Sequence, residues 1–89
     1  MSEANNTWRV DVDGREYEIE AEHSTFTGKI TVTVDGEEVA EDRMLMRKKD
    51  LVFEVAGQEA VVTTQFGNAG FSADTTLHFG GRYVEPLKR

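Results

Sequence analysis

Apolar and polar residues alternate along most of the chain, with the period of two that is typical of half-buried β-strands. Trp8, Val10 and Val12 share one side of the first such segment. Asp13-Gly14 follows, and this pair suits a two-residue type I′ hairpin turn because both positions need positive φ. A return strand then places Trp8 opposite Ile19, so the pattern predicts a β-hairpin at the start of the chain.

The next strand continues the same alternation. Residues 23–28 form a predicted loop, and pairing Glu22 with Lys29 across it places Ile19 opposite Val32. Because both residues are apolar, we expect the first three strands to share one buried face.

A second turn pair, Asp35-Gly36, predicts another tight hairpin and sets Val32 opposite Val39. The residues around this turn, Val32–Val39, match Val10–Tyr17 in pattern. We interpret them as two similar hairpins, because a repeat architecture needs at least three copies.

The segment 43–55 is predicted to form a third hairpin around a turn at Lys48-Lys49-Asp50, and Ala56-Gly57-Gln58 ends it. Its inner face would carry four apolar side chains: Leu45, Leu51, Phe53 and Val55.

A strand is predicted at 59–66. A loop at 67–70 then leads to a return strand, which brings Phe66 opposite Phe71. Gly80-Gly81 predicts a final tight turn that pairs Leu77 with Val84.

The whole pattern predicts an all-β protein, an antiparallel β-sandwich or flattened barrel of eight to nine short strands joined as hairpins in a meander. No segment shows the spacing of an amphipathic helix. We expect residues 1–6 to be a disordered N-terminal segment and residues 7–89 to form a single domain.

Charge and composition narrow the classes of partner. The chain has 89 residues and a formal net charge of −7, which disfavours nucleic acid and anionic membranes. It has no cysteine, no signal peptide and no apolar run long enough to span a bilayer, so we expect a cytoplasmic protein.

Few residues could carry catalysis. The two histidines are His23, in a predicted loop, and His78, a predicted cross-strand neighbour of Tyr83. Ser24 or Ser72 could complete a triad on paper, but no motif for an oxyanion hole accompanies them. Two histidines are also too few for a zinc site unless acids join them. We therefore expect no enzymatic activity, no metal and no cofactor.

A row of glutamates alternates along the second strand, with Arg9 and Lys29 predicted opposite two of its members: Glu16, Glu18, Glu20 and Glu22. Calcium sites draw six to eight oxygens from a curved loop, which a flat strand does not supply. We interpret the row as a solvated face.

The predicted 43–55 hairpin would leave an apolar patch on its outward side, formed by Met44, Met46 and Val52 beside Arg43 and Arg47. Exposed apolar patches commonly mark contacts, so we predict that this patch binds a partner protein or a second copy of the chain. A hairpin buried on both faces, or shifted by one residue, would instead place the methionines inside. Charging Met44 and Met46 distinguishes these cases, because only core methionines would be needed for folding.

Five short motifs follow one another in the first half of the chain: Trp8-x-Val10, Asp13-Gly14, Ile19-Glu20-x-Glu22-His23, Gly28-Lys29 and Val34-Asp35-Gly36. Looser matches continue at Phe53, Val55, Gly57 and Gly70-Phe71. Over residues 8–80 the chain therefore resembles the Fas apoptosis inhibitory molecule family.

The resemblance implies an all-β sandwich and a non-enzymatic protein-interaction module. Animal members of the family restrain death-receptor signalling and counter protein aggregation, and they carry two such domains, so this chain resembles a single-domain relative. An alternative is a small β-barrel that binds an apolar ligand, lined by six aromatic residues: Trp8, Tyr17, Phe53, Phe66, Phe71 and Phe79. An enzyme that uses His23 or His78 is the third alternative.

Overall fold

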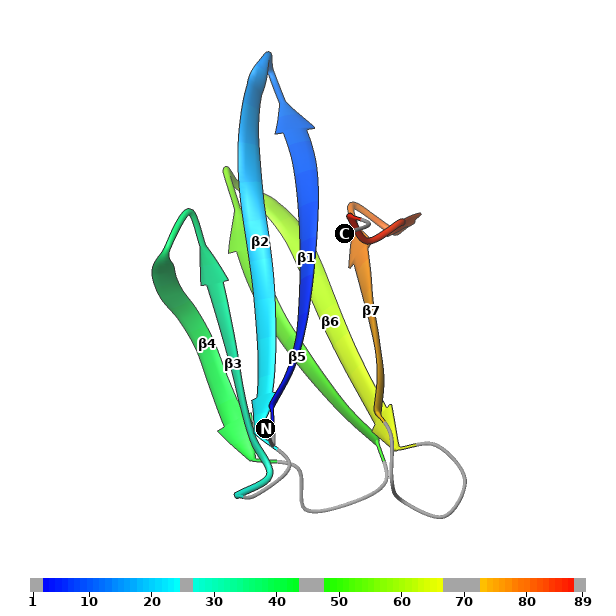
Figure 1. Ribbon diagram of the computed structural model, residues 1–89. Helices are drawn as coiled ribbons and strands as arrows, with labels where there is room; N and C mark the ends of the chain where they lie inside the picture. Colours follow the sequence, from blue (N-terminus) through cyan, green and yellow to red (C-terminus); the bar gives the residue numbers. More distant parts are fainter. Residues whose placement is uncertain (1–2, 25–26, 44–47, 67–72, 88–89) are drawn as a thin grey trace.

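The computed structural model describes residues 3–24, 27–43, 48–66 and 73–87, and these residues form β-strands and turns without a helix (Figure 1). The strands are β1 (Glu3–Val12), β2 (Arg15–Ser24), β3 (Lys29–Val34), β4 (Glu37–Arg43), β5 (Lys48–Val55), β6 (Gln58–Phe66), β7 (Ala73–Phe79) and β8 (Arg82–Val84).

The strands form two antiparallel four-stranded sheets, the first in the order β1-β2-β3-β4 and the second in the order β5-β6-β7-β8. The sheets pack on each other, which confirms the predicted all-β antiparallel sandwich. No helix that could cross a membrane occurs in the part of the chain that the structure describes.

Each sheet is built from two hairpins with the same kind of turn, and all four turns lie at one end of the molecule, uppermost in Figure 1. Both central residues of every turn have positive φ: Asp13-Gly14, Asp35-Gly36, Ala56-Gly57 and Gly80-Gly81. This geometry is that of the type I′ hairpin turn.

The four turns have the same residue pattern around them, with apolar residues one and three positions before the turn and again three positions after it. Our interpretation of only two similar hairpins was therefore incomplete. The pair Ala56-Gly57, predicted only to end a strand, is the turn that was missed, because alanine is not a typical residue for a positive φ.

Alternate residues of both sheets fill the space between them. The central cluster joins Trp8, Ile19 and Val32 of the first sheet to Phe53 and Leu77 of the second. The indole N–H of Trp8 is buried without a hydrogen-bond partner among the described residues, so this side chain stabilises the core by packing alone.

The N-terminal end differs from the expectation of a disordered segment at residues 1–6. β1 already begins at Glu3, which pairs with Ser24 of β2. β2 extends two residues into the predicted loop at 23–28, and this extension pairs with Glu3 and Ala4, while Asn5 and Asn6 pair with Glu22 and Ala21.

The register between β2 and β3 differs from the prediction by two residues. Ile19 lies opposite Val34, and not opposite Val32, while His23 lies opposite Ile30. The connection is shorter than predicted, because the Gly28 N–H donates to the Ser24 carbonyl at 2.8 Å. A shift of two keeps the same side chains on the inner face, so the predicted core residues remain inside.

A β-bulge between β3 and β4 changes the next pairing. The register shifts at Val32/Thr33, and Val32 lies opposite Ala40 instead of Val39. The extra residue is left out of the ladder, and Val39 is 40% exposed.

The predicted hairpin over 43–55 is wrong. β4 and β5 belong to different sheets, and Lys48-Lys49-Asp50 is part of β5, where Lys48 pairs with Gln65 of β6. These charged residues have the composition of a turn, but the β5–β6 ladder holds them in the strand, where the Thr63 hydroxyl also donates to Asp50 at 2.8 Å.

The other predictions for the second half of the chain are confirmed in part. Three of the predicted inward residues of 43–55 are buried, namely Leu51, Phe53 and Val55, whereas Leu45 lies outside the described residues. The pairing of Leu77 with Val84 is confirmed.

Phe66 lies opposite Ala73, so its predicted pairing with Phe71 is wrong. The β6–β7 ladder ends at the Phe66–Ala73 pair, and Ala73 comes two residues after Phe71 in the chain.

Candidate interaction surface

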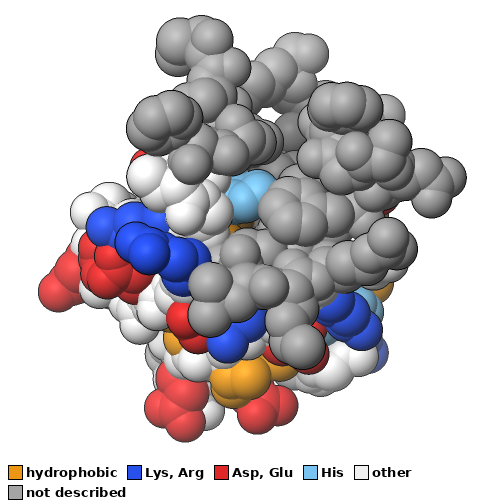
Figure 2. All heavy atoms as spheres, turned by 90° about the horizontal axis from the view of Figure 1, so that it is seen from below, with side chains coloured by type: hydrophobic (Ala, Val, Ile, Leu, Met, Phe, Trp, Pro, Cys, Tyr) orange, Lys and Arg blue, Asp and Glu red, His pale blue; other side chains and the backbone are white. Residues whose placement is uncertain are grey.

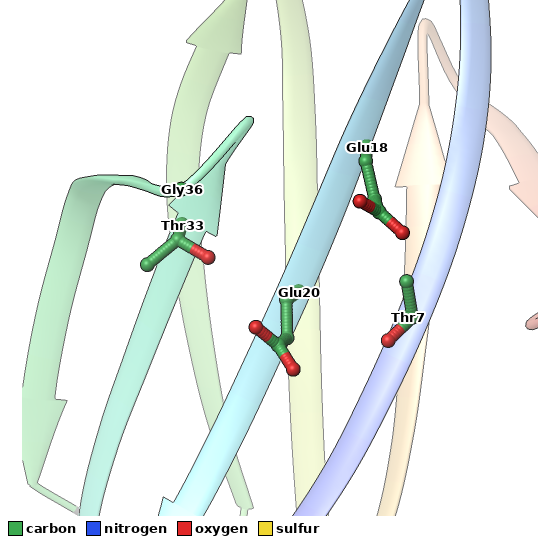
Figure 3. Close-up of a pocket in the computed structure, with 5 residues that line it drawn as sticks. All are labelled: Thr7, Glu18, Glu20, Thr33 and Gly36. Carbon is green, nitrogen blue, oxygen red and sulfur yellow. The ribbon is translucent and has the colours of Figure 1, made fainter.

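The predicted row of glutamates lies on the outer face of the first sheet. Figure 3 shows Glu18 and Glu20 of β2 between Thr7 of β1 and Thr33 of β3, with their side chains on the same side of the sheet. Together with Gly36 they line an open hollow of about 220 Å³. Thr7, Glu20 and Thr33 are direct cross-strand neighbours, so the hollow follows from the strand register.

This face has the chemistry of a solvated polar surface. Within the described residues no group of three or more His, Cys, Asp or Glu side chains is placed to hold a metal ion. Arg9 lies opposite Glu18, as predicted. Thr31, and not Lys29, lies opposite Glu22, because of the register shift described above.

Two ion pairs occupy the end of the molecule away from the four turns. Lys29 contacts Glu41 at 2.5 Å, and the hydrogen bond and charge of Glu41 raise the pKa of this lysine. Lys49 of the second sheet donates to Asp42 of the first at 2.8 Å, which lowers the pKa of Asp42 and links the sheets at one edge. Basic and acidic side chains accordingly lie side by side on this end (Figure 2).

The two histidines lie in different environments. His23 is 2% exposed on the inner face of β2, so its prediction as a loop residue is wrong. Burial lowers the pKa of this imidazole. His78 is exposed on β7 next to Tyr83, as predicted, with the two ring centroids 5.8 Å apart.

The residues named for a triad are distributed over both sheets. His23 points into the interior from the first sheet, whereas His78 lies on the outer face of the second. The Ser24 hydroxyl accepts a hydrogen bond from the Thr27 N–H at 3.3 Å and shapes the adjoining turn. Ser72 lies outside the described residues.

The predicted apolar patch is not a single hairpin surface. Arg43 ends β4 in the first sheet, whereas Val52 lies in β5 of the second. Both side chains are exposed, but on different sheets. Met44, Met46 and Arg47 lie outside the described residues.

The aromatic residues proposed to line a barrel belong to the packed interior where the structure describes them. Trp8 and Phe53 are buried in the central cluster, and Tyr17 and Phe79 pack against it. The side chains of Phe66 and Phe71 are outside the described set.

A stripe of apolar and aromatic side chains, not predicted from the sequence, lies on the outer face of the second sheet. Val52 pairs with Val61, Val61 with His78, and His78 with Tyr83, so the four residues cross the sheet from one edge to the other. Val52 is 61% exposed and Tyr83 is 56% exposed. We call these four residues the outer stripe.

Acidic residues border the outer stripe on the side of the four turns. Glu54 and Glu59 are direct cross-strand partners there, and both are exposed. On the other side Asp50 accepts the hydrogen bond of Thr63, and Lys48 follows two residues further along the same face. The turn side of the stripe therefore carries two facing carboxylates, whereas the other side carries Lys48 as well as Asp50 and Asp74.

The strand alternation contained part of the signal for this stripe. Each of its residues is next in sequence to a buried or partly buried residue of the inner face: Phe53, Val62, Leu77 and Val84. The missing information was the register between all four strands, which aligns the outward residues in one line.

The chain matches the model of a known protein family. Residues 4–88 match the family described as Fas apoptotic inhibitory molecule (FAIM1), which is nearly the whole chain. The match confirms the resemblance found over residues 8–80 and extends it at both ends. A search of curated proteins gave no match.

Proposed function

This chain belongs to the Fas apoptotic inhibitory molecule family, and we propose that it is a non-enzymatic protein-interaction module that binds a partner protein through the outer stripe. The observation that carries the proposal is the exposure of Val52 and Tyr83 at the two ends of a line that crosses the whole second sheet. Exposed apolar patches bordered by polar residues mark contact sites on soluble proteins.

The character of the ionisable residues supports binding without catalysis. The inward His23 is enclosed by the core, and the exposed His78 has the Tyr83 ring as its neighbour. A general acid or base needs room for a substrate beside it. The outer stripe instead offers a broad contact surface, which suits a macromolecular partner.

The amino-acid composition supports a proposal about the cellular compartment. The chain has no cysteine, so its fold needs no oxidising compartment, and a cytoplasmic location fits this composition. In that setting the domain acts as a regulator by occupying a partner's surface.

A paired set of variants tests the proposal. Val52→Asp/Tyr83→Asp places two charges on the outer stripe, and Thr31→Asp/Thr33→Asp places two charges on the outer face of the first sheet. Proteins from the native host that are cross-linked to the wild type should be lost with the first variant and kept with the second. Loss with the second variant alone would contradict the proposed site.

Two further measurements separate the remaining possibilities. Light scattering of wild type and Val52→Asp/Tyr83→Asp shows whether the partner is a second copy, because only a self-association through the stripe would disappear with this variant. Met44→Asp/Met46→Asp tests the patch predicted from the sequence. Retained binding with this variant assigns the contact to the stripe.

A further inference from the structure

We infer that the partner covers the outer stripe with an extended segment that carries Lys or Arg on the side facing Glu54 and Glu59. This inference rests on the proposed function, because it specifies the chemistry of the partner at the same surface. Three properties of the surface support it: its length, its acidic border and its effect on a second copy of the chain.

The length of the stripe suits a short segment. Neighbouring strands are about 4.8 Å apart, so four strands span about 14 Å from Val52 to Tyr83. An extended chain advances about 3.4 Å per residue, and about five residues therefore cover the stripe. Alternate side chains of such a segment point to the same side, so apolar residues at every second position would contact Val52, Val61 and Tyr83.

The acidic border determines the charge of that segment. Glu54 and Glu59 face each other directly across the β5–β6 ladder, and like charges in this position repel. Both residues adjoin the Ala56-Gly57 turn, and they lie one row from Val52 and Val61. A cation from the partner would relieve this repulsion and add attraction, whereas an anionic partner would increase it.

The same border disfavours a second copy as the occupant. Two copies that stack their outer stripes bring two Glu54–Glu59 pairs into one interface between chains of net charge −7. A basic segment of another protein has the complementary charge. Apolar contact to the stripe and cationic contact to the border then act together.

The test uses two blocked synthetic peptides, KKVTVTV and EEVTVTV, that differ only in charge. Their binding to the full chain is followed by shifts of the backbone amide signals in NMR spectra. We expect KKVTVTV to shift the amides around Val52, Val61 and His78, and to bind about tenfold more tightly than EEVTVTV.

Two matched charge reversals complete the design. Glu54→Lys/Glu59→Lys should reverse the preference between the peptides, whereas Glu18→Lys/Glu20→Lys makes the same charge change on the other sheet and should leave it within about twofold. Equal binding of both peptides, or shifts confined to the first sheet, would overturn the inference. Adding salt should weaken KKVTVTV binding, because exposed charges are screened.

The outcomes also separate this inference from the proposed function. If the peptides show no charge preference while Val52→Asp/Tyr83→Asp still abolishes capture of a host protein, the charged segment is wrong and the binding surface stands. If this variant leaves the capture unchanged and no peptide shifts the stripe, both fail together.

Discussion

The two sheets have the same hairpin plan and the same apolar inner face, but their outer faces differ in character. The outward residues of the first sheet include charges and hydroxyl groups, such as Glu18, Glu20 and Thr33, whereas those of the second include the exposed Val52 and Tyr83. Inner faces are constrained by packing, since each must fill the shared core. The outer faces are free of this constraint, and their difference is the basis on which we propose the second sheet as the contact side.

Substitutions in the core should change the free energy of unfolding most, and they test whether the two inner faces are equivalent. Ile19→Ala in the first sheet and Leu77→Ala in the second should each lower the free energy of unfolding by about 2–5 kcal/mol, because both side chains are fully buried in one cluster. Urea denaturation measures both values. A cost near zero for either residue would mean that its sheet does not share the core.

A smaller effect compares the turns of the two sheets. Asp13 has a φ of 54° and Ala56 has a φ of 52°, and alanine tolerates this left-handed region less well than Asp or Asn. Asp13→Ala should destabilise the first sheet and Ala56→Asn should stabilise the second, each by about 1 kcal/mol. Thermal and urea unfolding should both show a loss of stability for Asp13→Ala and a gain for Ala56→Asn. A change of the same sign in both variants would refute the turn assignment.

The pH dependence of the free energy of unfolding should differ between variants of the two histidines, and this difference should be the smallest of the three. Burial lowers the pKa of His23 below 6.5, so the unfolded chain binds this proton first as the pH falls. The free energy of unfolding should therefore decrease below about pH 6.5 and level off once the pH passes the lowered pKa of the folded state. The carboxylate of Asp42 lies in the same cross-strand row, opposite Ile30, and is held by Lys49.

Two variants isolate this dependence in urea titrations at several pH values. His23→Gln should flatten the slope between neutral and mildly acidic pH, whereas His78→Gln on the outer face of the second sheet should keep it. An unchanged slope in His23→Gln would assign the dependence to other groups.

Local features of this chain were predictable from its residues. The first hairpin has the expected register from Trp8–Ile19 onward, and the pairing of Leu77 with Val84 is also confirmed. In both cases a two-residue turn determines the register, because it joins neighbouring positions. Three of the four tight turns were recognised by their Asp-Gly or Gly-Gly pairs.

Errors arose where distant parts of the chain decide the structure. The bulge at Val32/Thr33 depends on how β4 meets β3, and the burial of His23 depends on the extension of β2 along β1. The charged stretch Lys48-Lys49-Asp50 has the composition of a turn, yet its pairing with β6 holds it in a strand. The candidate site was missed for the same reason, since the outer stripe joins residues from four strands.

Strand character, most of the tight turns and the family could be predicted from the residues alone, because alternation and turn residues act over a few neighbouring positions. Which strands share a sheet and which outward residues line up depends on long-range packing. Strand pairing joins residues far apart in the chain, and a period of two specifies a face but not its neighbour. The alignment of Val52 with Tyr83 is therefore a property of the folded second sheet.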